Sequence, residues 1–343
     1  MLKPHLHRCR SLHVDAHLSS SLPFIYKTFS GIEAPYLTSM ELVCDAYADD
    51  EYDEDSDAEL DDEFNPRLTH LVIDGKNFCR PAEESNCWID RRMGLNQLTI
   101  AQYQGDEYEE YSLKDFLDSV YLMVYPSQIK FEGLHFPRYF HDDLDYGFMI
   151  PFVQFEGASK EFISGISEFA TFSHVSVLRI TRCPLPNLHN FLDTTETLIL
   201  EDIDSTVDLL DAVAAWQGEN LWLDRCHSLS DVFLEALASP ILGFYPCGAM
   251  RRLLLHRLPN FSIILLKEMV EGRNALVHYN DPNWKTATGF GPSISHLAVV
   301  RCGIQKLSAQ DEEWFRSHLV EFYWGSLFVS SLQSVTDCMN PVP

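Results

Sequence analysis

Residues 220–239, NLWLDRCHSLSDVFLEALAS, combine two apolar periods in one short stretch. Leu221 and Leu223 are separated by one residue, which is the spacing of a short strand with one face on a core. Apolar residues then recur at the spacing of one helix face, and they are Val232, Leu234 and Leu237. The stretch therefore predicts a strand followed by a helix.

The strand half of this stretch recurs along the chain as an apolar-x-x-apolar-x-apolar pattern. The second apolar position of its eleven copies is held by Leu12, Met40, Leu71, Leu98, Ile129, Leu178, Leu198, Leu221, Leu253, Leu297 and Phe322. Successive copies lie 20 to 49 residues apart, whereas standard leucine-rich repeats run about 20–29 residues. The longest step predicts one further, degenerate copy within Phe148 to Phe155.

Stacking follows from the size of one repeat, because a single strand and helix cannot bury their own apolar face. Neighbouring repeats must supply the other half of the core, which places parallel strands on one side and helices on the other. We therefore expect an α/β fold: an irregular leucine-rich-repeat solenoid, a horseshoe with strands on its concave side and helices on its convex side, formed by residues 1–343 as a single domain.

Four Ser-x-x-Asp segments predict where helices begin, because a serine hydroxyl can accept a hydrogen bond from an unpaired amide of the first turn. The acid three residues later suits the positive end of the helix dipole. The four pairs are Ser112 with Asp115, Ser205 with Asp208, Ser228 with Asp231, and Ser308 with Asp311.

Cys183, Cys226 and Cys302 share one pattern position, three residues after the second apolar residue of their repeats. In leucine-rich repeats this position holds Asn or Cys, so we expect these thiols to bond to backbone in the turn. None of the three forms a C-x-x-C pair, which argues against a metal cluster.

The formal net charge of −26 arises from 51 acidic and 25 basic residues. Residues 45–63 alone contribute 12 acidic residues and no Lys or Arg. Such a segment repels itself and cannot bury apolar area, which predicts a disordered acidic loop over residues 45–65. The remaining chain is still acidic, and this argues against a nucleic-acid partner.

Targeting, membrane and redox signals are also informative. No apolar region follows the basic residues near Met1, and no apolar run approaches the roughly 20 residues of a membrane helix. Nine cysteines without a tight framework favour reduced thiols. We therefore expect a cytoplasmic or nuclear protein that binds no membrane.

Three segments contain residue types that could bind ions. The first holds His5, His7, Cys9, His13 and His17, and the second holds His135, His141, Asp142, Asp143 and Asp145; the third is the Gly289-x-Gly291 loop. None has the spacing of a recognised metal or phosphate site. Since no catalytic motif is present either, we expect no catalytic, cofactor-binding or metal-binding residues.

The side chains that alternate with the apolar strand residues predict a binding surface, because they point away from the core on the concave side. Trp222 among charged neighbours has the composition of a binding hot spot, with coverage by a long loop as the alternative interpretation. The candidate partner-binding residues are Arg179, Thr181, Glu201, Trp222, Asp224, Arg252 and His256, together with the apolar Ile199 and Leu254.

The amino-acid sequences of several repeats resemble those of fungal F-box proteins with leucine-rich repeats. The segments that carry this resemblance are LTHLVIDG (68–75), VSVLRITRCPL (175–185), TETLILEDID (195–204), residues 220–239 and CGAMRRLLLHRLPNFSIILLKEMVEGRN (247–274). The resemblance covers the repeat region only, because the pattern begins by Leu12 and no LP-x-E-[IL] opening of an F-box is visible.

The resemblance implies a non-catalytic scaffold, the substrate-recognition part of an F-box subunit of a cullin-type ubiquitin ligase. Its expected partners are a protein partner of unknown identity and, if an F-box exists upstream, a Skp-type adaptor. The alternative is a stand-alone interaction module with no ubiquitin link, whose acidic loop attracts a basic protein partner.

Overall fold

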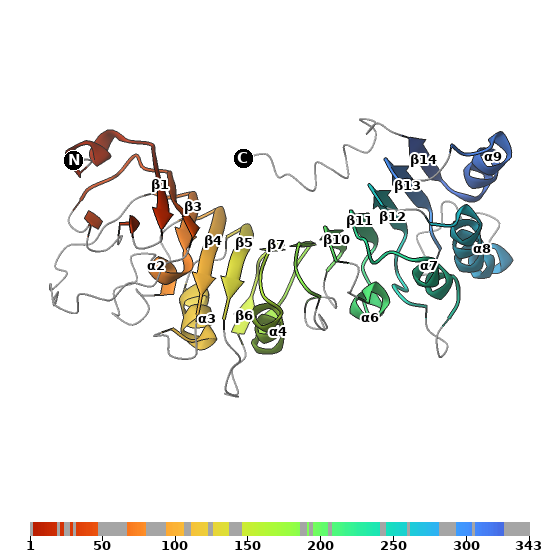
Figure 1. The fold of residues 1–343 in the computed structure, drawn as a ribbon, viewed down its shortest axis with the longest axis horizontal. Coiled ribbons are helices and arrows are strands. Elements are labelled where there is room, and N and C mark those ends of the chain that lie inside the picture. Colours follow the sequence, from red (N-terminus) through yellow and green to blue (C-terminus); the bar gives the residue numbers. More distant parts are fainter. Residues whose placement is uncertain are drawn as a thin grey trace. The chain divides into compact units, whose positions relative to one another are not determined.

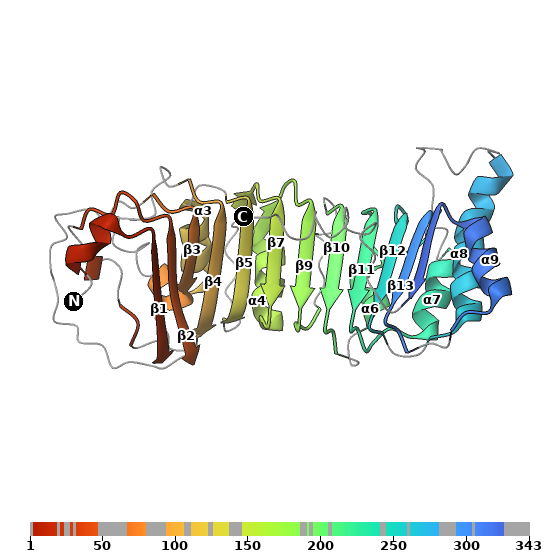
Figure 2. The ribbon, with the colours of Figure 1, turned by 90° about the horizontal axis from the view of Figure 1, so that it is seen from above.

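The computed structural model describes residues 3–18, 21–23, 28–29, 32–46, 67–79, 94–105, 111–122, 126–136, 146–185, 191, 195–204, 208–240, 245–258, 261–280, 293–303 and 306–325. It is an α/β structure with a parallel sheet of 12 strands that is not closed into a barrel (Figures 1 and 2). The chain divides into two compact units, Met1–Ser173 (unit one) and His174–Pro343 (unit two).

Unit one contributes six strands to this sheet, together with a separate pair of short strands. Its sheet strands are β1 (Ser11–Leu18), β2 (Ser39–Ala46), β3 (His70–Asp74), β4 (Gln97–Gln104), β5 (Gln128–His135) and β7 (Phe152–Glu156). The separate parallel pair is β6 (Tyr146–Phe148) and β8 (Ala170–Phe172). The helices are η1 (Lys3–Arg8), α2 (Gly75–Cys79), α3 (Leu113–Leu122) and α4 (Lys160–Phe169).

Unit two alternates strands and helices more regularly. Its strands are β9 (Val177–Thr181), β10 (Thr197–Glu201), β11 (Asn220–Asp224), β12 (Arg252–His256), β13 (His296–Val300) and β14 (Glu321–Gly325). Its helices are α6 (Leu209–Val213), α7 (Asp231–Ala238), α8 (Ile263–Asn280) and α9 (Ala309–His318). Figure 1 shows these helices on one side of the strands.

The strand register confirms the predicted apolar pattern. In unit one the predicted residues from Leu12 to Ile129 are partners of one another on neighbouring parallel strands. In unit two the same holds from Leu178 to Phe322. The degenerate copy predicted within Phe148 to Phe155 is β7, in which Val153 pairs with Ile129.

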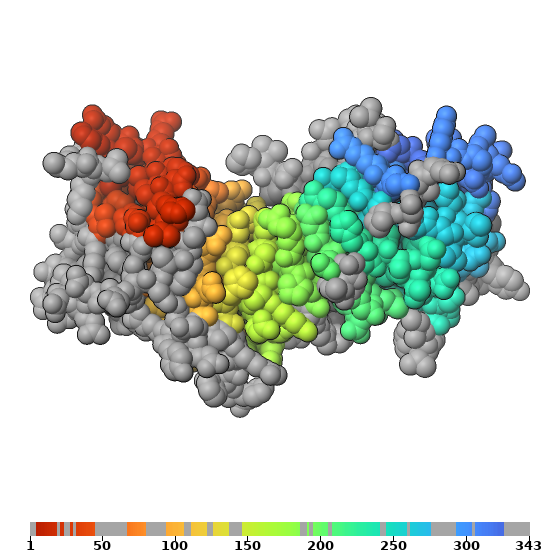
Figure 3. Space-filling view, in the orientation of Figure 1, coloured from red at the N-terminus to blue at the C-terminus, as the bar shows by residue number. Residues whose placement is uncertain are grey.

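The core lies between the strands and the helices, and the space between the ribbons is filled with side chains (Figure 3). In unit one, phenylalanine rings dominate it: Phe116 of α3 lies 5.4 Å from Phe78, 5.2 Å from Phe136 and 5.5 Å from Phe162 between ring centroids. In unit two, aliphatic residues such as Leu200 and Leu223 are fully buried. This burial is the main stabilising term of the stack.

A left-handed backbone residue follows each strand from β9 to β13. These residues are Arg182, Asp202, Arg225, Arg257 and Arg301, with φ between 49° and 53°. The backbone N–H of each donates to the carbonyl of the last residue in the next strand, at 2.9–3.0 Å. This hydrogen bond therefore holds the turn after each of these strands against the neighbouring repeat.

The three predicted turn cysteines donate their thiols to backbone carbonyls, which confirms their structural role. Cys183 Sγ lies 3.2 Å from Thr181 O, and Cys226 Sγ lies 3.3 Å from Leu200 O. Cys302 Sγ lies 3.4 Å from Leu255 O. Burial raises the pKa of the Cys226 thiol to about 12, so it remains protonated and able to donate.

Two of the four predicted helix starts are confirmed. Ser112 and Asp115 form a reciprocal capping box at α3, in which Ser112 N donates to Asp115 Oδ2 at 2.7 Å. Ser308 caps α9 by accepting from the Asp311 amide at 3.0 Å.

The other two predicted starts are wrong by two or three residues. The cap of α6 is Asp208, whose side chain accepts from the amides of residues 210 and 211. The cap of α7 is Ser230 rather than Ser228. Asp231 instead accepts from the Ser262 amide before α8 at 2.8 Å, and Val232, predicted on the apolar face, is 67% exposed.

A buried arginine holds the segment before β12 against α8. Arg273 is fully buried, and its guanidinium donates to Pro246 O at 2.9 Å and to Cys247 O at 2.7 Å. Burial lowers the pKa of Arg273 to about 10, so the side chain is still charged at neutral pH. Cys247 O also accepts from the Met250 amide at 3.0 Å, so the guanidinium adds a second bond to this turn.

The predicted acidic loop begins inside a strand, because β2 extends to Ala46 and so includes the first two residues of the 45–65 range. Residues 47–65 lie outside the described residues. Within the described part of the chain, no helix has both the length and the apolar character needed to span a bilayer.

Candidate functional site

The sheet face of unit two opposite its helices carries the candidate site, and we call it the helix-free face. Side chains alternate along each strand, so the residues between the buried apolar positions point to this face. All seven predicted binding residues lie on it. They are Arg179 and Thr181 on β9, Glu201 on β10, Trp222 and Asp224 on β11, and Arg252 and His256 on β12.

The middle position of each strand forms a row across this face, which we call the central row. In unit two it reads Arg179, Ile199, Trp222, Leu254, Ala298 and Tyr323 from β9 to β14. The same row of unit one is mostly polar: His13, Glu41, Val72, Thr99, Lys130 and Gln154. The two units share a backbone pattern and differ in the chemistry of this face.

The apolar part of the central row packs into a cluster with Val300, the last residue of β13. Leu254, Ala298 and Val300 are buried, and the partly buried Trp222 and Tyr323 pack against them. On β14 the Tyr323 hydroxyl lies close over Gly325, where a Cβ would be only 2.7 Å from Tyr323 Oη. The tyrosine ring thus occupies the space above the glycine, beside Val300 on the neighbouring strand.

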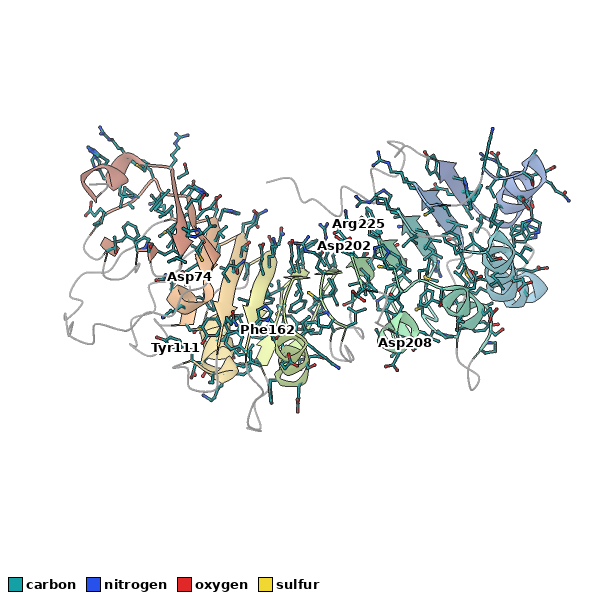
Figure 4. The ribbon with its side chains drawn as sticks, viewed as in Figure 1. Asp74, Tyr111, Phe162, Asp202, Asp208 and Arg225 are labelled. Carbon is teal, nitrogen blue, oxygen red and sulfur yellow. The ribbon has the colours of Figure 1, made fainter. Side chains whose placement is uncertain are left out.

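A network of ion pairs borders this cluster at the ends of the strands. Glu201 accepts from Arg179 Nη2 at 2.5 Å and from Arg225 Nη2 at 2.9 Å. Arg225 also reaches Asp202 through Nε at 2.5 Å. Figure 4 shows Arg225 and Asp202 near the strands, on the opposite side from Asp208 at the start of α6.

Asp224 is the second centre of this network. Arg257 contacts it through two nitrogens, with Nε 2.9 Å from Oδ1 and Nη2 on Oδ2. This pairing raises the pKa of Arg257. His256 Nδ1 lies 3.1 Å from the same carboxylate, yet burial and the neighbouring Arg257 and Arg301 together lower the pKa of this histidine.

The acids and bases of this network lie at different depths. The side chains of Glu201 and Asp224 are only 12% and 6% exposed, whereas those of Arg179, Arg225 and Arg257 are 30%, 33% and 35% exposed. The carboxylates lie beneath and the guanidiniums lie above them. The surface offered to a partner is therefore rich in hydrogen-bond donors, although the chain as a whole is strongly acidic.

Sequence reasoning missed five contributors to this face. Ala298, Val300 and Tyr323 occupy the same positions on β13 and β14 as predicted residues do on β11 and β12, so extending the alternation to these strands would have found them. Arg225 and Arg257 follow their strands in the left-handed region. Their inward reach toward Glu201 and Asp224 depends on that backbone conformation, which the apolar pattern does not encode.

The histidine-rich segment near the N-terminus forms local pairs among the described residues. His5 pairs with Arg8, and His13 Nδ1 lies 2.9 Å from Glu41 Oε2 across β1 and β2. Among the residues that the structure describes, no three His, Cys, Asp or Glu side chains gather to hold a metal ion. Residues 141–145 and the Gly289-x-Gly291 loop fall outside the described residues.

A shallow pocket in unit one lies at the ends of β4 and β5. It is lined by Gln104, Gly105, His135, Phe136, Ser159 and Glu161. Ser159 is the N-cap of α4 and already accepts from the Phe162 amide at 3.1 Å. This pocket combines one histidine and one carboxylate on an open surface, with no arrangement that activates a nucleophile.

Compared with family models, curated proteins and solved structures, the chain matches none of them. The evidence for the candidate site is therefore its geometry. An apolar row with two aromatic rings lies beside three partly exposed arginines, on a sheet face that no described helix covers.

Proposed function

We propose that the protein is a non-catalytic protein-binding scaffold that receives its partner on the helix-free face of unit two. The observation that carries this proposal is the apolar row from Trp222 to Tyr323 on a face with no described helix. Aromatic side chains beside arginine are the residues most enriched at binding hot spots. The polar central row of unit one supports the choice of unit two.

We further propose that the fold is an irregular leucine-rich-repeat solenoid of the F-box-protein type. The parallel strands in one register, the helices on one side of each unit, and the thiols bonded in the turns support it. On this proposal the protein works inside the cell, in the cytoplasm or nucleus, as the substrate-recognition part of a ubiquitin ligase. The alternative is a stand-alone interaction module.

The scaffold proposal is tested by affinity capture with matched variants. Trp222→Ala removes an anchor of the central row, and Tyr121→Ala is the control, because Tyr121 is 42% exposed on α3 of unit one. We expect proteins captured by the wild type to be lost with Trp222→Ala and kept with Tyr121→Ala. Circular dichroism checks that both variants fold. Equal capture by both variants would exclude this face.

The two versions of the proposal differ in their partners. Direct binding to a purified Skp-type adaptor would support the ligase version, and its absence would favour the stand-alone module. Deleting residues 45–63 tests the version in which the acidic segment attracts a basic partner: we expect capture to weaken, and unchanged capture would exclude that role.

A further inference from the structure

The three arginines around Glu201 use their guanidinium groups in the same way. Arg179 and Arg257 donate through Nε and Nη2, and Arg225 contacts its two carboxylates through the same two nitrogens. In the contacts between described residues, Nη1 of these three side chains takes no part. Each arginine is thus held in place by a buried or partly buried acid, while no described residue pairs with the Nη1 end of its fork.

Being held in place matters because ordering a long side chain on binding costs free energy. Arg179, Arg225 and Arg257 are already fixed by Glu201, Asp202 and Asp224. A guanidinium fork also matches the planar geometry of a carboxylate and the oxygens of a phosphate. A preorganised row of such forks is suited to an anion rather than to a neutral group.

Arg225 and Arg257 occupy the turn position that follows their strands, with φ of 50° and 49°. The other turns after strands β9 to β13 share this left-handed conformation, and the backbone N–H at each one donates to the neighbouring strand. This turn geometry places both arginine side chains at the strand ends, next to Glu201 and Asp224.

The row of arginines and the apolar cluster overlap on the same strands. Trp222 of β11 precedes Arg225 by three residues, and Leu254 of β12 precedes Arg257 by three residues. Neighbouring strands lie about 4.8 Å apart, so β9 to β12 span about 14 Å, the reach of four or five residues of an extended chain. One short segment can therefore contact both features.

We infer that the guanidiniums of Arg179, Arg225 and Arg257 bind an anionic side chain of a protein segment whose apolar residue packs on Trp222 and Leu254. The anion is a carboxylate or a phosphoryl group, which share this recognition chemistry. The inference deepens the proposed function and rests on it, because it names the kind of partner that the scaffold receives.

Four synthetic peptides test the inference directly with the full chain. Each carries a Leu-Leu pair preceded by four identical residues: glutamate, phosphoserine, glutamine or lysine. We expect the glutamate or phosphoserine peptide to bind at least tenfold more tightly than the glutamine peptide, with affinity falling as salt rises. The glutamate and phosphoserine arms distinguish the two sources of the anion.

Variants then assign the binding to the arginine row. Arg225→Gln and Arg257→Gln should each reduce the affinity for the anionic peptide at least fivefold. Arg316→Gln is the control, because Arg316 is 61% exposed on α9 and pairs with Glu312, and it should leave binding unchanged. If a variant unfolds, the wild type is used instead. Phenylglyoxal modifies arginine side chains, and the bound peptide should protect Arg225 and Arg257 from this modification.

The outcomes separate the inference from the proposed function. Equal binding of the glutamine and glutamate peptides, lost in Trp222→Ala, would overturn the anion inference and leave the scaffold in place. Binding of none of the peptides, or preference for the lysine peptide, would also overturn the inference. The capture experiment with Trp222→Ala then decides the scaffold proposal independently.

Discussion

Asp224 is a buried carboxylate that faces both Arg257 and His256 on the helix-free face. A carboxylate without partners at this depth would be costly. Two nitrogens of Arg257 instead satisfy its oxygens, while the His256 ring fills the neighbouring position on β12. The carboxylate of Asp224 therefore links the ends of β11 and β12.

The substitution Asp224→Asn is expected to lower the free energy of unfolding by about 2 kcal/mol, because hydrogen bonds to charged groups are the stronger ones. Urea denaturation measures the change. Glu312→Gln is the matched control: its carboxylate is 50% exposed beside Arg316, and such pairs contribute about 0.5 kcal/mol. Equal losses in both variants would contradict the structural role of Asp224.

His256 predicts how stability depends on pH. Burial, and then the charges of Arg257 and Arg301, lower its folded-state pKa, against the opposing effect of Asp224. The unfolded chain, with a histidine pKa near 6.5, then binds a proton that the folded chain does not. Stability is therefore expected to fall as the pH drops through about 6.5 toward the folded-state pKa.

Burial and Arg252 lower the pKa of His296 on β13 in the same direction, so the double variant His256→Gln/His296→Gln is the informative one. Its urea midpoint should change less than that of the wild type between pH 7.5 and 5.5. His227→Gln, at an exposed turn position, should keep the wild-type slope. A double variant as pH-sensitive as the wild type would contradict the assignment.

Helices α7 and α8 pack so closely that the smallest side chain decides their contact. A Cβ on Gly272 of α8 would lie 2.4 Å from the carbonyl oxygen of Ala238 at the end of α7. Helix propensity alone favours alanine over glycine by about 1 kcal/mol. Overpacking a contact that a backbone atom limits costs about 1–3 kcal/mol.

The substitution Gly272→Ala is therefore expected to destabilise the protein, by up to about 2 kcal/mol net of the propensity gain. Thermal denaturation followed by circular dichroism gives the sign directly. Glu271→Ala is the control at the adjacent exposed position, where a change within about 0.5 kcal/mol is expected. A higher melting temperature for Gly272→Ala would show that the helices move apart easily.

Elements were predictable where apolar spacing determines them. The residues from Leu178 to Phe322 share one row because strand alternation has a fixed period, and β7 was found in the longest step by the same rule. Helix starts were less predictable, since any serine or aspartate near a strand end can cap. Asp208 and Ser230 cap helices α6 and α7 because the preceding turn ends at these residues. The residue at which a turn ends depends on packing.

The candidate site was predictable only where strand alternation determines which face a side chain lies on. Alternation placed Trp222 and Asp224 on the face away from the core. It could not show that Tyr323 covers Gly325 on the same strand, because the apolar pattern does not determine the conformation of a side chain. Nor could it show that Arg257 turns back over Asp224, because that contact joins residues distant in sequence. The left-handed φ of the arginines is likewise a product of stacking.

At the scale of the molecule, stability in a stack comes from neighbouring repeats rather than from each repeat alone. In unit two, β11 has paired strands on both sides, and its Leu221 and Leu223 are buried. β14 pairs with β13, and no second strand pairs with it among the described residues. Its Phe322 and Trp324 are only partly buried, although both stack near Phe315 of α9.

Native-state hydrogen exchange is therefore expected to be graded along unit two. The amides of β11 should exchange most slowly, and those of β14 at least about tenfold faster, since opening the last strand exposes only one interface. Mass spectrometry of the untreated protein, corrected for intrinsic exchange rates, measures the difference. If β14 were protected as strongly as β11, its outer edge would be covered in solution, and nearest-neighbour stacking of the described strands would not account for its stability.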